Sequence, residues 1–175
     1  MKMSRRYTPI SPMNQKNKNQ VIIGIDPGTT RIGYGVVSFD GRNITCLSYG
    51  LIENKSKDSA EQFRNTKKKI EGLISRHQPS RFVVEKLFFC KNQKTVMAVS
   101  EMRGMINAMI LERGIELAEY TPLEVKMAIT GYGRADKDQV QKMARLILGI
   151  KNEIKPDDVA DALALAICGT APRPM

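Results

Sequence analysis

The chain has 175 residues, the size of one domain whose hydrophobic core folds without disulfides. Its 42% hydrophobic and 26% charged residues are typical of a soluble globular protein, and no apolar run approaches the roughly 18 residues that span a bilayer, which excludes a membrane-spanning protein. The net charge of +10 indicates a nucleic-acid partner; an anionic membrane surface, or charge that serves only solubility, are the alternatives.

The first twenty residues differ in composition from the rest of the chain. They carry five basic and no acidic side chains, show no apolar periodicity and lack the apolar segment of a secretory signal. We therefore expect a disordered basic arm over residues 1–20, a single domain over 21–170 and a short tail over 171–175.

The first half of the domain predicts strands and one helix. Apolar runs typical of strands cover 21–26, 33–40, 44–52 and 81–87. The sequence "DGRN" after the second run is a hairpin turn signal. Between the third and fourth runs, residues 58–77 have helical spacing, with apolar side chains on one side and "KKK" on the other.

The second half predicts mostly helices. A strand at 115–120 is followed by a short helix that opens at Pro122, by the glycine-rich loop "TGYGRADK", and by helices over 137–149 and 156–168. Three meandering strands, then alternating strands and helices, predict an α/β fold with a five-stranded mixed sheet and helices on both faces.

Residues 93–113 predict a long helix that is apolar on more than one side. A helix packed only on its own sheet needs an apolar arc of about 100°. The second apolar side could contact another subunit or be buried within the domain, and the sequence leaves both interpretations open.

Four carboxylates have surroundings that are unusual for surface charges. Asp26 ends the apolar strand "VIIGID", and Glu85 interrupts "FVVEKLFF". Asp158 and Asp161 lie in the otherwise apolar "PDDVADALALAI", at the i, i+3 spacing that puts both on one helix face. Asp157 shares a face with Asp161 at i, i+4, so spacing alone does not decide which aspartate pairs with Asp161.

The carboxylates also have simpler interpretations, of which the one for Asp161 is the weakest, because a carboxylate in the middle of a helix gains little from helix propensity. Asp157 or Asp158 could cap the helix behind Pro156, Asp26 could accept turn amides, and Glu85 could end an exposed strand. Four such groups together are costly to bury unless a positive charge lies between them.

Magnesium would supply that charge. Mg²⁺ prefers oxygen ligands and binds through a few carboxylates and substrate phosphate, and two such ions can flank a scissile phosphodiester. A single histidine and three dispersed cysteines make zinc the poorer choice, and the cysteine usage fits a reducing, intracellular setting.

The chain resembles the RuvC-type Holliday-junction resolvases, which have a ribonuclease-H-like fold. The matching segments are "GIDPGTTRIGYGV", "VVEKLFFCKN", "EMRG", "LEVKMAITGYGRADKDQVQ" and "DDVADALALAI". They occur in the family's order and cover about residues 21–169.

The resemblance implies a role for each matched residue. Asp26, Glu85, Asp158 and Asp161 fall on the family's catalytic, metal-binding carboxylates, and the "D-x-x-D-A-L-A" spacing selects Asp158 over Asp157. The remaining matches imply DNA contacts: phosphate contacts by two lysines and base stacking near the crossover by an aromatic residue, namely Lys126, Lys137 and Phe88.

The resemblance also implies the reaction and its partners. It implies a nuclease domain that resolves four-way DNA junctions by paired symmetric nicks with 5′-phosphate ends, in recombination and repair. Two Mg²⁺ ions per site are implied, with Mn²⁺ as a substitute. A homodimer, a branch-migration motor complex as partner, and a bacterial, cytoplasmic, nucleoid-associated location are further expectations.

Three other functions start from the same residues. "GIDPGTT" is similar to the first phosphate motif of actin-like ATPases and sugar kinases, but those proteins need two lobes and a second glycine-rich turn. A catalytically inactive junction-binding protein is disfavoured because all four carboxylates are present. Another ribonuclease-H-like nuclease, such as a transposase, is disfavoured by the contexts of Lys126, Lys137 and Phe88.

Overall fold

The computed structural model describes residues 19–86 and 93–171. Phe88 and nearly all of the predicted basic arm lie outside this range. In chain order the elements are β1 (Gln20–Asp26), β2 (Arg31–Phe39), β3 (Ile44–Glu53), α1 (Ser59–His77), β4 (Arg81–Glu85), α2 (Gln93–Glu112), β5 (Glu116–Tyr120), α3 (Pro122–Thr130), α4 (Lys137–Leu148) and α5 (Asp157–Cys168). Every predicted strand and helix is confirmed, with ends that shift by two residues or fewer.

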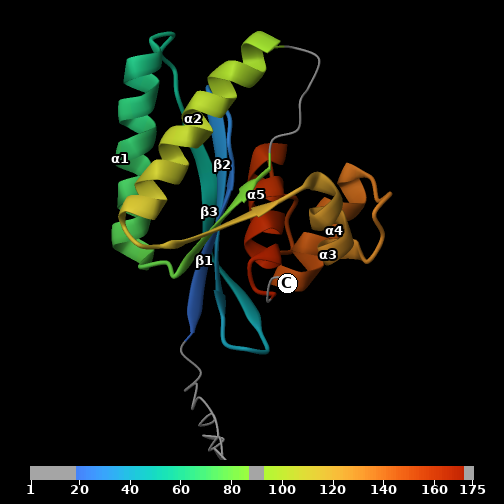
Figure 1. The fold of residues 1–175 in the computed structure, drawn as a ribbon. Coiled ribbons are helices and arrows are strands. Elements are labelled where there is room, and N and C mark those ends of the chain that lie inside the picture. Colours follow the sequence, from blue (N-terminus) through green and yellow to red (C-terminus); the bar gives the residue numbers. More distant parts are fainter. Residues whose placement is uncertain (1–18, 87–92, 172–175) are drawn as a thin grey trace, which may run out of the picture.

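The strands form one mixed sheet in the order β3-β2-β1-β4-β5. The first three strands along the chain pair antiparallel, whereas β4 pairs parallel with both β1 and β5. Figure 1 shows α1 and α2 on one face of this sheet and α3, α4 and α5 on the other. The predicted mixed sheet with helices on both faces is therefore confirmed.

The predicted hairpin turn is closed by its own aspartate. Asp40 Oδ1 accepts hydrogen bonds from the backbone N–H groups of Arg42 and Asn43, both at 2.8 Å. An aspartate at the first turn position stabilises the reversal in this way, since its carboxylate satisfies amides that the tight turn leaves free.

Two hydrophobic cores lie on the two faces of the sheet. One contains Ile22 and Val83 with the buried side of α5, and the other contains Ile23 and Phe82 with α1 and α2. Neighbouring residues of one strand thus enter opposite cores, as the period of two requires. Every second residue of β1 and β4 consequently faces α5.

Helix α5 lies unusually close to the sheet. A Cβ atom on Gly24 of β1 would stand 2.0 Å from the carbonyl oxygen of Ala162, and one on Gly33 of β2 would stand 1.9 Å from that of Asp158. Only glycine leaves room for this backbone-to-backbone approach. On the helix side, the buried Ala162 and Ala166 stand at this contact.

Helix α2 buries one apolar side and exposes another. Met102, Ile106 and Ile110 are fully buried in the core shared with α1, whereas Met97 and Leu111 are 65% and 59% exposed. The second apolar side is therefore not covered by the described part of this chain. Contact with another subunit stays a prediction.

Among the residues that the structure describes, no helix has both the length and the apolar character needed to cross a membrane.

The close approach of α5 predicts the effect of adding a single methyl group. Gly24→Ala places its Cβ against backbone atoms of Ala162 and Ala166, which cannot rotate away. We expect a loss of about 3 kcal/mol in the free energy of unfolding, at the upper end for overpacking, measured by urea denaturation.

Gly72→Ala is the matched control. Gly72 lies within α1, and no atom would come within 4 Å of an added Cβ. This variant should gain about 0.5–1 kcal/mol from helix propensity. Similar effects of the two substitutions would contradict the steric explanation.

Candidate active site

Asp26 and Glu85 lie side by side at one end of the sheet. β1 and β4 are parallel, and Ile25 stands opposite Val84, so the next residue of each strand brings its carboxylate to the same edge. Both side chains point to the face that α5 covers, because Ile25 and Val84 belong to the opposite core.

Helix α5 supplies the second pair of carboxylates. Pro156 is its N-cap residue, without a side-chain cap hydrogen bond, so neither Asp157 nor Asp158 caps the helix. Asp158 Oδ2 lies 3.2 Å from Arg31 Nη2, and Asp161 Oδ2 lies 3.0 Å from Lys137 Nζ. Each of the two predicted ligands on α5 thus meets a basic side chain from another element.

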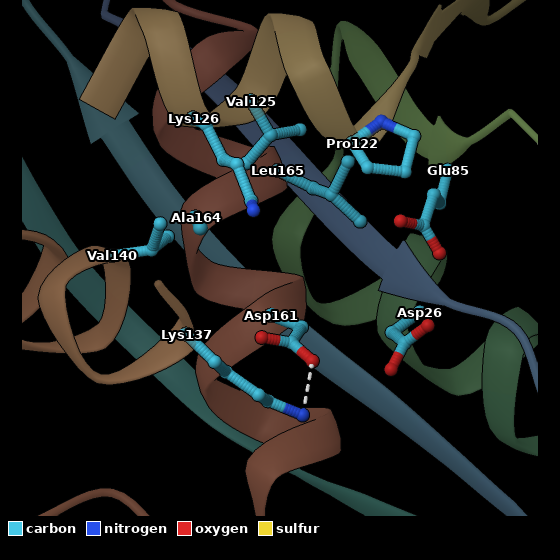
Figure 2. A pocket seen from close by; sticks show the side chains of 10 residues that line it. All are labelled: Asp26, Glu85, Pro122, Val125, Lys126, Lys137, Val140, Asp161, Ala164 and Leu165. Atoms are coloured by element: carbon cyan, nitrogen blue, oxygen red, sulfur yellow. Dashed lines mark ion pairs between the residues drawn. The ribbon is translucent and has the colours of Figure 1, made fainter. Parts of the chain in front are cut away.

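The side chains of Asp26, Glu85 and Asp161 line one pocket of about 210 Å³. Figure 2 shows the carboxylates of Asp26 and Glu85 directed toward each other, with Lys126 entering from α3 and Lys137 from the start of α4. Five of the predicted site residues therefore share one cavity. Asp158 does not line it, and Phe88 lies outside the described residues.

Lys137 bridges two aspartates. Its Nζ lies 3.0 Å from Asp161 Oδ2 and 3.2 Å from Asp157 Oδ2. The hydrogen bond from Lys137 lowers the pKa of the exposed Asp157, whereas burial raises the pKa of Asp161 despite the same ammonium. The sequence left Asp157 and Asp158 as alternative partners of Asp161. The structure places Asp157 on the outer side of Lys137 rather than in the pocket.

Burial and mutual repulsion disfavour ionisation of the strand carboxylates. Burial, followed by the charges of Glu85, Asp161 and Asp158, raises the pKa of Asp26 to about 8. Burial and the charge of Asp161 also raise the pKa of Glu85. These groups repel one another in a poorly hydrated space, where an additional cation would stabilise all of them.

The donor chemistry fits a divalent ion such as Mg²⁺. All the acidic groups at the site offer carboxylate oxygens, and Asp158 Oδ2 is buried without a hydrogen bond although it lies near Arg31. Within residues 19–86 and 93–171, no three His, Cys, Asp or Glu side chains are close enough to form a ready ligand cluster. The expected carboxylates are present, and two of them, Asp158 and Asp161, lie against basic side chains.

Arg103 fixes the position of Glu85, a role that the sequence did not reveal. Its Nε donates to the Glu85 carbonyl at 3.1 Å, and its guanidinium pairs with Glu119 on β5. Arg103 lies in the segment "EMRG", which carries part of the family resemblance, but the resemblance implied no role for this arginine. Arg31, the first residue of β2, was also missed, although its place directly after the turn that follows Asp26 was a signal.

Comparison with known proteins identifies the relatives of this chain. The family model described as "Crossover junction endodeoxyribonuclease RuvC" matches residues 22–169. Curated proteins of that description from Alkaliphilus metalliredigens and Moorella thermoacetica are 45% and 46% identical over 151 and 149 residues, which is 85% of this chain and 91% and 89% of theirs.

The solved structures include a close match in fold. "T. thermophilus RuvC in complex with Holliday junction substrate" has a TM-score of 0.81 and 31% identity, covering 86% of this chain and 97% of that one. The expected ribonuclease-H-like fold is confirmed by this match.

The raised pKa of Asp26 predicts how stability depends on pH without divalent metal. Between its unfolded value of 3.8 and about 8, the folded protein keeps a proton that the unfolded chain has released, so stability falls as pH rises through this range. At pH 8, Asp26→Asn should therefore be more stable than the parent by on the order of a few kcal/mol. Urea denaturation in EDTA between pH 5 and 8 measures this difference, which should widen with pH.

Asp40→Asn is the control of opposite sign. Backbone hydrogen bonds from Asn43 and Arg42 lower the pKa of Asp40, so its carboxylate stabilises the fold once ionised, and its loss should destabilise the protein at pH 8. A gain for Asp26→Asn that is the same at pH 5 and pH 8 would contradict the proposed cause.

Proposed function

The chain belongs to the RuvC family of crossover junction endodeoxyribonucleases, and we propose that its carboxylate pocket cuts DNA strands at the crossing point of a Holliday junction. The observation that carries this function is the family match over residues 22–169 together with a pocket that joins Asp26, Glu85 and Asp161 to two lysines. Paired symmetric nicks that leave 5′-phosphate ends would resolve the junction in recombination and repair.

The proposed ligands of the metal are Asp26, Glu85, Asp158 and Asp161. The RuvC family is metal-dependent, and we propose Mg²⁺, two ions per site, with Mn²⁺ as a substitute. When bound, such ions lower the pKa of attacking water and stabilise the leaving oxygen. The protein's part is orientation: the parallel pairing of β1 and β4 and the close packing of α5 bring the carboxylates to one edge.

Lys126 and Lys137 are the proposed phosphate contacts. Lys126 is half-buried in the pocket wall, and Lys137 is shared between Asp157 and Asp161. An ammonium group in each position attracts the scissile phosphate and offsets charge that develops on its oxygens. Phe88 is proposed to stack on a base near the crossover.

The wider assembly follows the family. We propose a homodimer in which two sites cut strands of like polarity, with the exposed side of α2 as its candidate interface, and a branch-migration motor complex acting on the same junction. The relatives named above are bacterial, and we propose that the protein acts in the cytoplasm at the nucleoid.

Cleavage should depend on the α5 carboxylate and on divalent metal. Asp161→Asn keeps the shape of the side chain but removes a negative ligand, so we expect at least a hundredfold slower cutting of a labelled four-way junction in Mg²⁺. Gel analysis of the products measures the rate, and the parent protein in EDTA should be equally slow.

Asp58→Asn is the matched control for this variant. Asp58 caps α1, far along the chain from the pocket-lining aspartates, and asparagine caps a helix equally well. Cutting should proceed at the parental rate. Normal cutting by Asp161→Asn would refute the metal assignment, and equal cutting of linear duplex would refute selectivity for the junction.

Lys126→Ala should change the salt dependence of binding. If Lys126 contacts one phosphate, its loss weakens binding to junction and duplex alike and reduces the slope of log K against log salt by about 1. Fluorescence anisotropy in EDTA at several salt concentrations measures this slope. Lys68→Ala, on α1 across the sheet, should leave it unchanged; equal slopes for parent and Lys126→Ala would exclude the contact.

A further inference from the structure

An exposed apolar patch borders the catalytic pocket. Its members are Leu123 and Met127 on α3 and Tyr132 in the loop that follows, and they are 60%, 51% and 56% exposed. The proposed cleavage chemistry uses none of them. Large apolar side chains that gather on one surface mark a contact site for a partner.

The patch continues from the pocket wall. Successive residues of a helix are rotated by about 100°, so Pro122 and Val125, which line the pocket, and Leu123 and Met127, which form the patch, occupy neighbouring sides of α3. Lys126 lies between the two sides and reaches into the pocket (Figure 2). A substrate bound at the pocket is therefore positioned to contact the patch as well.

The loop holds Tyr132 in a fixed position. Thr130 Oγ1 donates to the Lys126 carbonyl at 2.8 Å and accepts from the Tyr132 N–H at 3.1 Å. The Ala135 N–H donates to the Tyr132 carbonyl at 3.0 Å. A Cβ on Gly133 would stand 2.7 Å from Leu123 Cδ1, so the loop lies against the patch. A side chain on such a constrained backbone loses little entropy when a ligand binds it.

The charges around the patch indicate what binds there. Lys126 and the exposed Arg134 form no ion pair within the described stretches of chain, and the whole protein carries +10. An aromatic ring on a surface that also carries unpaired cations is typical of nucleic-acid binding, since bases stack on the ring while phosphates meet the cations. A purely apolar protein partner would leave these cations without counter-charges.

On the basis of the proposed function, we propose that Tyr132, supported by Leu123 and Met127, stacks on a nucleobase beside the branch point of the junction. Arg134 then contacts a phosphate next to that base. Within a duplex each base is covered on both faces, so a ring can stack only where the helix is interrupted. Tyr132 is thus a selectivity residue for branched over linear DNA, on the side of the pocket that α3 forms.

The test measures binding without cleavage, in an Asp161→Asn background with EDTA. An immobile four-way junction carries 2-aminopurine beside its branch point, and a linear duplex of the same sequence is the reference. We expect Tyr132→Ala to weaken junction binding at least fivefold, as the loss of one stacked base requires. The change in 2-aminopurine fluorescence that stacking of the tyrosine ring causes should also disappear. Duplex binding should change less than about twofold.

Two further variants separate stacking from other effects. Tyr132→Phe keeps the ring and should bind the junction like its background protein. Tyr49→Ala removes another exposed tyrosine, on β3, and should change nothing. Thermal unfolding of each variant verifies that the fold is intact.

Three outcomes of these binding measurements would overturn the proposal. If Tyr132→Ala binds the junction within twofold of the Asp161→Asn background protein, the proposal is overturned and the patch is assigned to a protein partner. Equal losses on junction and duplex overturn base stacking in favour of a backbone contact. If the background protein binds no junction at all, the proposed function fails, and this inference fails with it.

Discussion

The site depends on the backbone contact between α5 and the first two strands. An aspartate side chain is short, so the close approach of helix and strand helps Asp161 to share a pocket with Asp26. Gly24 and Gly33 make that approach possible, because any side chain there would enter the helix backbone. Ala162 and Ala166 of α5 complete the contact, so the small residues of both elements determine where the carboxylates meet.

This contact gathers like charges in a partly buried space, which the rest of the fold has to compensate. Hydrophobic cores on both faces of the sheet supply the stability, and basic side chains supply local counter-charge. Arg103 holds the Glu85 backbone, Arg31 faces Asp158, and Lys137 faces Asp161. Burial and the neighbouring carboxylates still raise the pKa of Asp26, although Lys137 lowers it.

The sequence predicted the elements and the acidic residues well, because both leave local signals. Period-two and helical spacing reveal strands and helices, and a carboxylate in an apolar run is visible without a structure. Which basic side chain meets which carboxylate depends on tertiary contacts, so the pairs Arg31–Asp158 and Lys137–Asp157 did not emerge. Spacing alone also could not decide between Asp157 and Asp158. In the structure neither lines the pocket, and the two differ in their partners and burial: Asp157 is exposed beside Lys137, whereas Asp158 is more buried and faces Arg31.

With the roles proposed above, the ion pairs at the pocket would link metal binding to DNA binding. Lys137 Nζ holds Asp161, so a cation that binds Asp161 competes with that ammonium, while Asp157 remains as a second partner for it. Asp157 is exposed, so water screens its carboxylate. It therefore attracts the Lys137 ammonium less strongly than a phosphate at the same distance would. Displacement from Asp161 therefore leaves Lys137 weakly held at the pocket mouth. With the roles proposed above, Lys137 would become available to a DNA phosphate once a cation has replaced it at Asp161.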